Sequence, residues 1–324
     1  MPHSFAKPDR AADFATSQRT ARRELAEGLR QPQARISPKY FYDALGSKLF
    51  EAICQLDEYY LTRTEAAIFE AHAADIARTA GLGATLIDLG AGNCEKAVRL
   101  FPALNPSHYV PVDISVEFLM ARTEALQTQY PELKLYPIGQ DFSETFVLPD
   151  AVQKLDHKLF FYPGSSLGNF APLAATQFLQ RLRVACGNAG GAILIGADLI
   201  KDTATLEAAY DDQLGVTAAF NLNGLRHANR ILQSNFDISQ WRHQAFFNAA
   251  QSRIEMHLQA REDLIVNFLG GSRKFAAGET IHTENSYKFS RATLLGMLEQ
   301  AGFGNAICWT DAQQNFLVCH AHAI

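Results

Sequence analysis

The sequence lacks the features that membrane proteins, secreted proteins and nucleic-acid-binding proteins need. It has no run of about 18 apolar residues, so we expect no transmembrane helix. Its first residues lack the apolar core of a secretory signal peptide. The 29 Lys and Arg residues are outnumbered by 34 Asp and Glu residues, and the net charge of −5 offers no basic surface for nucleic acid. We therefore expect a cytoplasmic protein with a small-molecule ligand.

Metal and disulfide signals are also missing. The five cysteines are widely scattered and form no CxxC pair, which excludes a disulfide framework and fits a reducing compartment. The ten histidines include no HExxH motif, so we expect no metal. His320 and His322 lie two residues apart near the end of the chain, and we place them on one side of a terminal strand.

Alternating strands and helices are present from residue 85 onward. Five segments have the character of buried strands: TLIDLGAG, HYVPVDIS, LKLYPIGQDF, KLFFYPGSSLGNF and GAILIGADLI. Helical patterns at about 95–104, 115–129 and 172–185 lie among them. Strands that alternate with helices predict a parallel, doubly wound α/β sheet.

The remaining segments are more varied. Residues 14–30 predict an amphipathic helix with Leu25 and Leu29 on its apolar face, and Thr62 or Thr64 can cap a long helix that ends near Thr79. Residues 202–250 are mixed and partly helical, with Trp241 and Phe246 as expected core anchors. RIEMHLQA and DLIVNFL predict two antiparallel strands around a turn at 261–263. A helix follows Phe289, and AICWTD and NFLVCHA form a final strand pair.

These patterns predict a discontinuous organisation. We assign residues 61–200 and 287–324 to the sheet domain, and residues 1–60 and 201–286 to a second α+β domain. The ligand cleft is expected between the two domains, at the carboxyl ends of the strands.

The first strand runs into a glycine turn. Gly90 and Gly92 let the backbone approach a nucleotide closely, but Glu95 stands where a dinucleotide-binding turn has its third glycine. A ligand without phosphate does not need that glycine, and S-adenosylmethionine is such a ligand. A glycine turn alone is weak evidence, because such turns are common.

The next two strand ends carry acids. Asp113 lies 23 residues beyond Gly90, close to the spacing of a ribose-binding carboxylate, although it is also suited to capping the following helix. The third strand ends at Asp141 and Phe142, an acid for the adenine amine and a ring for the adenine face. Together the three strand ends predict a class I methyltransferase.

The fourth strand leads into Pro163–Phe170, which faces the methyl group and the acceptor in methyltransferases. Asn169 in this segment offers both a hydrogen-bond donor and an acceptor to an amino-acid head group. The alternative is that Asn169 caps the helix that begins at Pro172.

Several segments together resemble one enzyme family. They are SPKYFYDALGSKLFEAICQLDEYYLTRTEAAIF, LIDLGAGNCEK, FYPGSSLGNF, AYDDQLGVTAAFN, RIEMHL and TENSYKF. In this order, over about residues 18–322, they resemble the L-histidine Nα-methyltransferases of ergothioneine biosynthesis. The resemblance implies transfer of three methyl groups from S-adenosylmethionine to the α-amino group of histidine, which gives hercynine.

The resemblance also implies a set of site residues. The cofactor set is Tyr42, Gly90, Lys96, Asp113, Asp141 and Phe142. The substrate set is Tyr59, Gly164, Asn169, Tyr210, Phe220, Met256, Glu284 and Ser286, with Tyr59 and Asn169 as the catalytic pair. In the family pattern, Asn169 and Tyr210 hold the substrate carboxylate. Glu284 and Ser286 bond the imidazole, and Tyr59 lies beside the amine.

The chemistry of these residues agrees with that assignment. A Glu two residues from a Ser on one strand places both on one face, where each can meet one ring nitrogen; a solvated strand face is the alternative. The attacking amine must be neutral, and Tyr59 can accept or relay its proton, as can solvent. The rings of Tyr42, Phe50, Tyr59 and Phe220 can favour a methylated cation, with core packing as the alternative for Phe50.

Three other functions fit parts of the pattern. One is a methyltransferase for another small amino acid or amine, and another is a nicotinamide-dependent dehydrogenase. The third is a non-catalytic homologue that binds histidine or S-adenosylmethionine. We expect a monomer whose partner is L-histidine, with no nucleic acid and no membrane.

Overall fold

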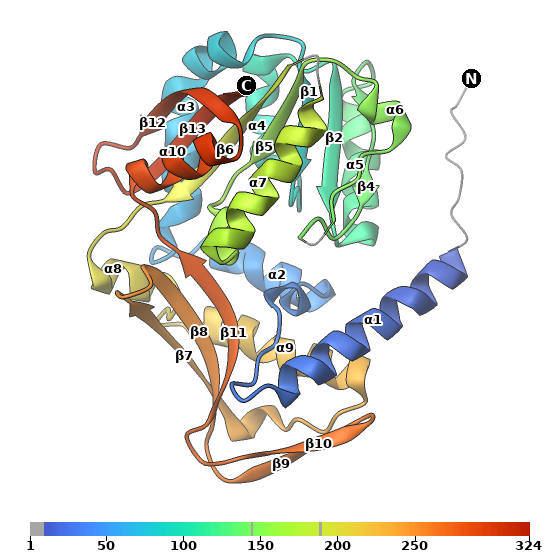
Figure 1. Ribbon diagram of the computed structural model, residues 1–324, viewed down its shortest axis with the longest axis vertical. Helices are drawn as coiled ribbons and strands as arrows, with labels where there is room; N and C mark the ends of the chain where they lie inside the picture. Colours follow the sequence, from blue (N-terminus) through green and yellow to red (C-terminus); the bar gives the residue numbers. More distant parts are fainter. Residues whose placement is uncertain (1–9, 144, 188–189) are drawn as a thin grey trace. The chain divides into compact units, whose positions relative to one another are not determined.

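The structure is a computed structural model that describes residues 10–143, 145–187 and 190–324. The chain divides into two compact units (Figure 1). The sheet unit comprises 57–206, 247–254 and 285–324, and the second unit comprises the residues up to 56, 207–246 and 255–284. The predicted domain boundaries at 60, 200 and 286 stay a prediction.

A twisted sheet of mostly parallel strands forms the centre of the sheet unit. Its order is β12-β13-β6-β5-β1-β2-β3, with β4 beside β2. The parallel strands are β1 (Thr85–Leu89), β2 (His108–Asp113), β5 (Lys158–Tyr162) and β6 (Gly191–Asp198), while β12 (Phe303–Thr310) and β13 (Phe316–Ala323) pair antiparallel. This order confirms the predicted doubly wound α/β sheet and the class I methyltransferase fold.

Helices of the sheet unit bury one apolar face each against the strands. They are α3 (Tyr60–Ala80), α4 (Glu95–Leu104), α5 (Val116–Gln129), α6 (Asp150–Gln153), α7 (Pro172–Cys186) and α10 (Arg291–Gln300). Phe160, Phe178 and Ile193 are fully buried in the resulting core. The predicted caps of α3 are wrong, because the helix begins before Thr62 and Tyr59 holds its N-cap position. Its end is as expected, with Gly81 at φ 81°.

The third predicted strand forms only in part. Two short pieces, β3 (Lys134–Leu135) and β4 (Ile138–Gly139), each pair with β2. Pro137 lies between them and has no N–H to donate to a neighbouring strand, which accounts for the interruption.

The second unit combines helices with antiparallel strands. It contains α1 (Arg10–Arg30), the 3-10 helix η1 (Pro38–Phe41), α2 (Ala44–Ile53) and α9 (Val216–Leu232), and α8 (Thr203–Ala208) lies at its boundary. Leu25 and Leu29 are buried in its core, as the apolar spacing predicts. Trp241 is buried there too, as expected.

Two predictions for the second unit are wrong. RIEMHLQA and DLIVNFL do not pair: β8 (Arg253–Ala260) lies between β7 (Trp241–Asn248) and β11 (Thr280–Tyr287), whereas β9 (Leu264–Phe268) pairs with β10 (Gly271–Phe275). The two-residue turn before Gly271 contains Gly270 at φ 86°, which favours the β9–β10 hairpin. Phe246 is no core anchor, because it is 41% exposed and its ring stacks on His257.

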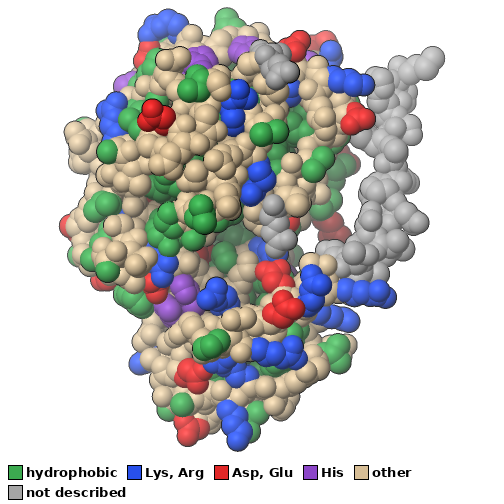
Figure 2. Space-filling view, viewed as in Figure 1, with side chains coloured by type: hydrophobic (Ala, Val, Ile, Leu, Met, Phe, Trp, Pro, Cys, Tyr) green, Lys and Arg blue, Asp and Glu red, His purple; other side chains and the backbone are tan. Residues whose placement is uncertain are grey.

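Among the described residues, no helix combines the length and the apolar character that a membrane span requires. Figure 2 shows that basic and acidic side chains are both distributed over the visible face.

Candidate active site

The glycine turn after β1 is tied to the end of β2. Gly90 and Gly92 have φ angles of 72° and 51°, which glycine adopts without strain. The Gly92 N–H donates to Asp113 Oδ2 at 2.9 Å, and the Ser115 N–H donates to Asp113 Oδ1 at 2.8 Å. Ser115, not Asp113, holds the N-cap position of α5. Each carboxylate oxygen of Asp113 keeps a second lone pair, which is what two ribose hydroxyls require.

Lys96 and Gly164 meet at a buried carboxylate that the sequence reasoning missed. Glu65 of α3 is 1% exposed. Its Oε2 lies 2.8 Å from Lys96 Nζ, and its Oε1 accepts the Gly164 N–H at 2.7 Å. Gly196 of β6 leaves room for it, because a Cβ there would lie 2.2 Å from Glu65 Oε1. The sequence does carry a signal for this residue, because Glu65 is an acid in the second turn of a helix whose buried face is otherwise apolar.

Phe142 lies beside the glycine turn. Its half-buried ring packs against Tyr162 and Phe178, with centroids 6.1 Å and 5.8 Å away. Phe142 Cζ is 3.9 Å from the position that a Cβ on Gly90 would occupy. Asp141, the preceding residue, accepts hydrogen bonds from the backbone and hydroxyl of Ser143. The structure therefore brings Gly90, Phe142 and the Asp113 loop to the same end of the sheet.

A second acid lies inside the sheet below this turn. Asp88 of β1 is 1% exposed, and burial raises its pKa to about 7 although a 2.6 Å hydrogen bond from the Tyr109 hydroxyl opposes that shift. The nearby charge of Asp113 raises the pKa of Asp88 further. Asp88 thus links β1 to Tyr109 of β2 and need not carry a full charge at neutral pH.

The predicted substrate residues of the sheet unit lie on three elements. Tyr59 is 9% exposed at the start of α3. Asn169 is exposed at the end of η2 (Ser166–Asn169), and its helix-cap alternative is wrong because Ala171 holds the N-cap position of α7. A Cβ on Gly168 would lie 2.7 Å from the Tyr287 carbonyl, so η2 packs against the end of β11, next to Ser286.

Ser286 belongs to a buried ionic network. Lys288 Nζ donates to Ser286 Oγ at 2.9 Å and lies 2.8 Å from Asp198 Oδ2, and both charged side chains are fully buried. Asp198 also lies 2.6 Å from Lys201 Nζ and accepts from the Tyr60 hydroxyl at 2.8 Å. Burial lowers the pKa of Lys201, which the charge of Asp198 opposes. The sequence analysis did not single out Asp198. Its position as an acid at the end of a buried strand could have indicated this network.

Aromatic rings predicted to surround a methylated amine gather in the second unit. Phe220 of α9 is 3% exposed, and its ring centroid lies 5.3 Å from that of Tyr42 and 5.9 Å from that of Phe50. Tyr42 and Phe50 are half-buried and meet edge to face at 5.6 Å. Three of the four predicted rings are therefore together.

Tyr210 is held through its backbone. The Nε2–H of His243 donates to the Tyr210 carbonyl at 2.8 Å, and the side-chain amide of Asn221 donates to His243 Nδ1 at 2.8 Å. Burial lowers the pKa of His243, which favours the neutral ring that this pattern needs. Sequence reasoning did not single out His243 or Asn221.

Glu284 and Ser286 both lie in β11, so strand alternation places them on one face of that strand, as predicted. Met256 is 2% exposed in β8 between Glu255 and His257. Alternation directs its side chain to the face opposite those two residues. The predicted place of Met256 beside the imidazole stays a prediction.

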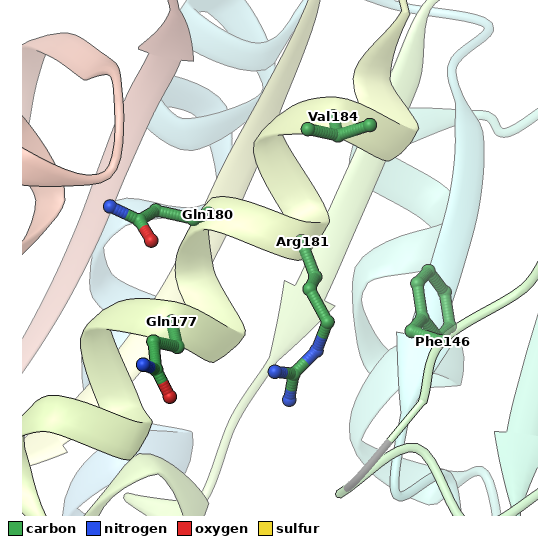
Figure 3. Close-up of a pocket in the computed structure, with 5 residues that line it drawn as sticks. All are labelled: Phe146, Gln177, Gln180, Arg181 and Val184. Carbon is green, nitrogen blue, oxygen red and sulfur yellow. The ribbon is translucent and has the colours of Figure 1, made fainter.

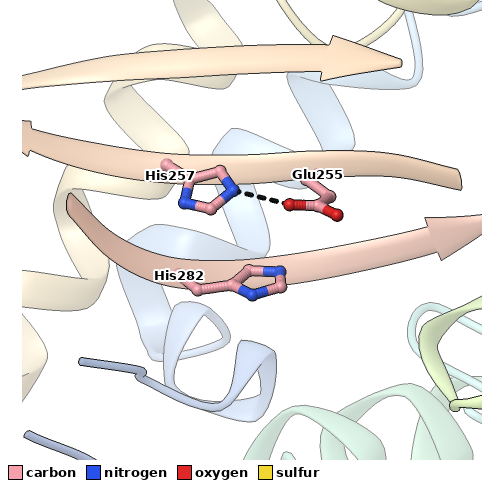
Figure 4. Close-up of side chains that lie close together, drawn as sticks. All are labelled: Glu255, His257 and His282. Atoms are coloured by element: carbon pink, nitrogen blue, oxygen red, sulfur yellow. Dashed lines mark hydrogen bonds and ion pairs between the residues drawn. The ribbon is translucent and has the colours of Figure 1, made fainter. Parts of the chain in front are cut away.

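Glu255, His257 and His282 are side chains of the types that bind metals, and Figure 4 shows them on β8 and β11. Their potential ligand atoms lie within 4.8 Å of one another. However, His257 Nε2 is hydrogen-bonded to Glu255 at 3.0 Å, and the two imidazole rings stack with an interplanar angle of 19°. The lone pairs of two nearly parallel rings point in similar directions. Binding of one metal ion by both rings would need these lone pairs to converge on a single point. The arrangement fits a hydrogen-bonded stack better than a metal centre.

A surface hollow lies elsewhere, along the outer side of α7 (Figure 3). It is lined by Phe146, Gln177, Gln180, Arg181 and Val184. None of the predicted site residues lines it.

The chain is similar to several known proteins. A family model described as "Histidine-specific methyltransferase, SAM-dependent" matches residues 21–323. The chain is 37% identical to the histidine N-alpha-methyltransferase of Mycolicibacterium smegmatis, over 94% of this chain and 95% of that protein. It is 38% identical to the Mycobacterium tuberculosis protein of the same name, over 91% and 92%.

A fungal relative is similar over a part of its length. Ergothioneine biosynthesis protein 1 of Neurospora crassa is 32% identical over 83% of this chain and 31% of that protein. Together with the glycine turn, the Asp113 loop and the class I sheet, these matches show that the chain belongs to the S-adenosylmethionine-dependent, histidine-specific methyltransferases.

Proposed function

We propose that this protein transfers methyl groups from S-adenosylmethionine to the α-amino nitrogen of L-histidine and gives the trimethylated product hercynine. The observation that carries the proposal is the Glu284–Ser286 pair on β11, in a chain whose family is histidine-specific. A carboxylate and a hydroxyl on one strand face offer one partner to each imidazole nitrogen.

The cofactor residues fit S-adenosylmethionine, which supplies an electrophilic methyl group on a sulfonium. Asp113 would accept the two ribose hydroxyls, and Asp141 with Phe142 would hold the adenine. Lys96 is 35% exposed in its side chain and would bind the carboxylate of the methionine part. Glu65 partly neutralises Lys96 and so limits the net positive charge there. Gly90 would let the backbone approach the cofactor, and Tyr42 is proposed as a further cofactor contact.

The substrate residues would orient the amine for in-line attack. Asn169 and Tyr210 would hold the histidine carboxylate, with Gly164 lining the path of the methyl group. Tyr59 would receive or relay the proton that a protonated amine must lose before it attacks. A nitrogen–carbon bond then forms as the sulfur–carbon bond breaks, and alignment of the two groups supplies much of the rate enhancement.

Successive methylation leaves a permanent positive charge. The Tyr42–Phe50–Phe220 cluster offers aromatic faces to such a charge, at about 0.5–2 kcal/mol for each favourable contact. Met256 is proposed to shape the pocket by its bulk.

The test is incubation of the purified protein with L-histidine and S-adenosylmethionine, followed by mass spectrometry. We expect three methyl groups on histidine and three molecules of S-adenosylhomocysteine for each hercynine. Methylation of another amino acid but not of histidine would favour the alternative substrate. Binding of histidine without any product would identify a non-catalytic homologue.

A further inference from the structure

Two of the five cysteines face each other at the edge of the central sheet. β12 is the edge strand and pairs antiparallel with β13, and Cys308 stands directly opposite Cys319 in that register. Their sulfur atoms lie 3.2 Å apart, and both side chains are free thiols. Sequence spacing does not indicate this pair, because only the strand register brings the two residues together.

The register meets the distance requirement of a disulfide. Directly opposed residues of an antiparallel pair have Cα atoms about 4.5–5.5 Å apart. Disulfides join residues whose Cα atoms are about 4.4–6.8 Å apart, through a sulfur–sulfur bond of about 2.05 Å. Because the pairing continues on both sides, from Ile307 with His320 to Trp309 with Val318, the bond can form by side-chain rotation while the strands stay in place.

The two sulfur atoms differ in their surroundings. Cys308 is partly exposed, whereas Cys319 is fully buried in the core of the sheet unit. The hydrogen bond from the Cys319 thiol lowers the pKa of Cys308 to about 7, and the charge of Arg291 acts in the same direction while burial opposes both. The same hydrogen bond, together with burial, raises the pKa of Cys319. Cys308 is therefore the nucleophilic thiolate, and Cys319 is the thiol held beside it.

We propose that Cys308 and Cys319 form a dithiol site that reacts with hydroperoxides, in which Cys308 attacks and Cys319 resolves. First, the Cys308 thiolate attacks a peroxide oxygen. A sulfur–oxygen bond forms, the oxygen–oxygen bond breaks, and the departing hydroxide takes a proton from solvent. Second, Cys319 loses its proton and its sulfur attacks that of Cys308. The disulfide forms as the sulfur–oxygen bond breaks, and the oxygen leaves with that proton as water. Two thiols are oxidised while one hydrogen peroxide is reduced to two waters.

The first step prepares the second. The hydrogen bond to the Cys308 thiolate is the largest cause of the raised pKa of Cys319, and the negative charge of Cys308 adds to it. Oxidation of Cys308 to a sulfenic acid removes that charge. Cys319 then loses its proton more easily, which favours the disulfide over further oxidation of Cys308.

The experiment treats the purified full-length protein with hydrogen peroxide at neutral pH. The protein is then unfolded, its remaining thiols are alkylated, and each cysteine is located by mass spectrometry. An endoprotease that cuts before Asp311 separates Cys308 from Cys319. We expect the two resulting peptides to be linked, with the loss of two hydrogen atoms, and dithiothreitol to restore both thiols.

Variants assign a role to each sulfur atom. In Cys319→Ala, Cys308 should stop at the sulfenic acid, and labelling of Cys308 by dimedone should rise at least about tenfold over the wild type. In Cys308→Ala, the linked peptides should be lost and Cys319 should stay a thiol. Cys186→Ala is the matched control, because Cys186 is another fully buried cysteine of the sheet unit, and it should form the disulfide as the wild type does.

The wild-type protein alone can overturn the inference. It fails if peroxide leaves both residues as thiols, if Cys308 is oxidised to a sulfinic acid with no link to Cys319, or if either residue is linked to a different cysteine. Sulfenic acid on Cys319 in Cys308→Ala would contradict the assigned roles, and loss of the link in Cys186→Ala would show that the reaction does not belong to this pair. None of these results depends on methyl transfer, so they are independent of the proposed function.

Discussion

Single carboxylate side chains hold the site together through hydrogen bonds to the backbone. Asp113 accepts from two backbone amides, and Glu65 accepts from the Gly164 N–H while it pairs with Lys96. These bonds fix the carboxylates before any ligand arrives, which lowers the entropy cost of binding. A substitution at such a residue therefore changes the loop as well as the contact.

Asp113→Ala is expected to weaken S-adenosylmethionine binding by at least about 1.5 kcal/mol, the scale of hydrogen bonds to a charged group. Asp113→Asn keeps one oxygen acceptor, so it should lose less. Calorimetry with S-adenosylhomocysteine measures both, and thermal unfolding of the apoproteins reports the loss of the Gly92 and Ser115 bonds. Unchanged affinity in the Ala variant would rule out Asp113 as the ribose-binding acid.

Glu284→Ala should leave a ring N–H unpaired in a buried pocket. The expected loss is about 1.5–3 kcal/mol, roughly one to two decades in kcat/KM for histidine. Phenylalanine and tryptophan have no such ring nitrogen to satisfy, so they should lose less or gain from the larger pocket.

The matched control is Asn169→Ala. Every amino-acid substrate carries the carboxylate that Asn169 is proposed to hold, so kcat/KM for histidine, phenylalanine and tryptophan should fall together. If Glu284→Ala lowered kcat/KM equally for all three substrates, Glu284 would not be the residue that recognises the imidazole.

At the scale of elements, the start of α9 depends on one acid. Asp212 accepts from the Val216 and Thr217 N–H groups at 2.9 Å and 2.7 Å, which are among the N–H groups that a helix leaves unpaired. Burial raises the pKa of Asp212, but the hydrogen bonds that the carboxylate accepts, chiefly from Thr217 and Val216, together outweigh burial and lower the pKa. α9 carries Phe220 and Asn221, so its first turn positions part of the proposed site.

Asp212→Ala should destabilise the fold by about 1 kcal/mol, whereas Asp212→Asn should cost less because its one amide oxygen can still accept from one of the two N–H groups. A lowered folded-state pKa means that the stabilisation is present above the unfolded value near 3.9 and is lost as pH falls through the folded value. Urea unfolding at neutral pH and below about pH 4 measures both effects. The gap between wild type and Asp212→Asn should narrow in acid, and a constant gap would contradict the ionic part of the argument.

The elements that local patterns predict best are those with a strong period and a clear end. The helix over 95–104 is confirmed to the residue, and the strands predicted in TLIDLGAG and HYVPVDIS begin at Thr85 and His108 as expected. Local pattern failed where tertiary pairing decides, as in β8, which pairs with β7 and β11 rather than with β9. The prediction for Phe246 is wrong for the same reason. Its ring stacks on His257, and the residue type alone does not show whether a phenylalanine packs in the core or on a polar side chain.

The site was predicted unevenly for a related physical reason. Gly90, Asp113 and Phe142 follow from strand ends, because the carboxyl ends of parallel strands share one edge of the sheet. Glu65, Lys288 and His243 act through other residues that are distant in sequence: Lys96, Asp198 and Tyr210. No spacing rule relates such pairs, and only the folded chain reveals them.

At the scale of the whole molecule, the proposed ligand residues are divided between the two units. Gly90, Lys96 and Asp113 belong to the sheet unit, whereas Tyr42 and Tyr210 belong to the second unit. If residues of both units bind the same ligands, ligand binding should raise the free energy of local opening in each unit. Local opening free energies, which hydrogen exchange measures, report that response segment by segment.

Histidine together with S-adenosylhomocysteine should protect residues 39–60 and 205–222 from amide exchange. At ligand concentrations about 100 times Kd, openings that require ligand release should cost about 2.7 kcal/mol more and slow roughly a hundredfold. S-adenosylhomocysteine alone is the control, and it should protect the glycine turn near residues 88–96 more than residues 205–222. Asn169→Ala, with its weaker hold on histidine, should lose the added protection at the same ligand concentration. Equal exchange of 205–222 with and without both ligands would mean that Tyr210 and Phe220 do not bind the substrate, and the proposed site would then have to be built from the sheet unit alone.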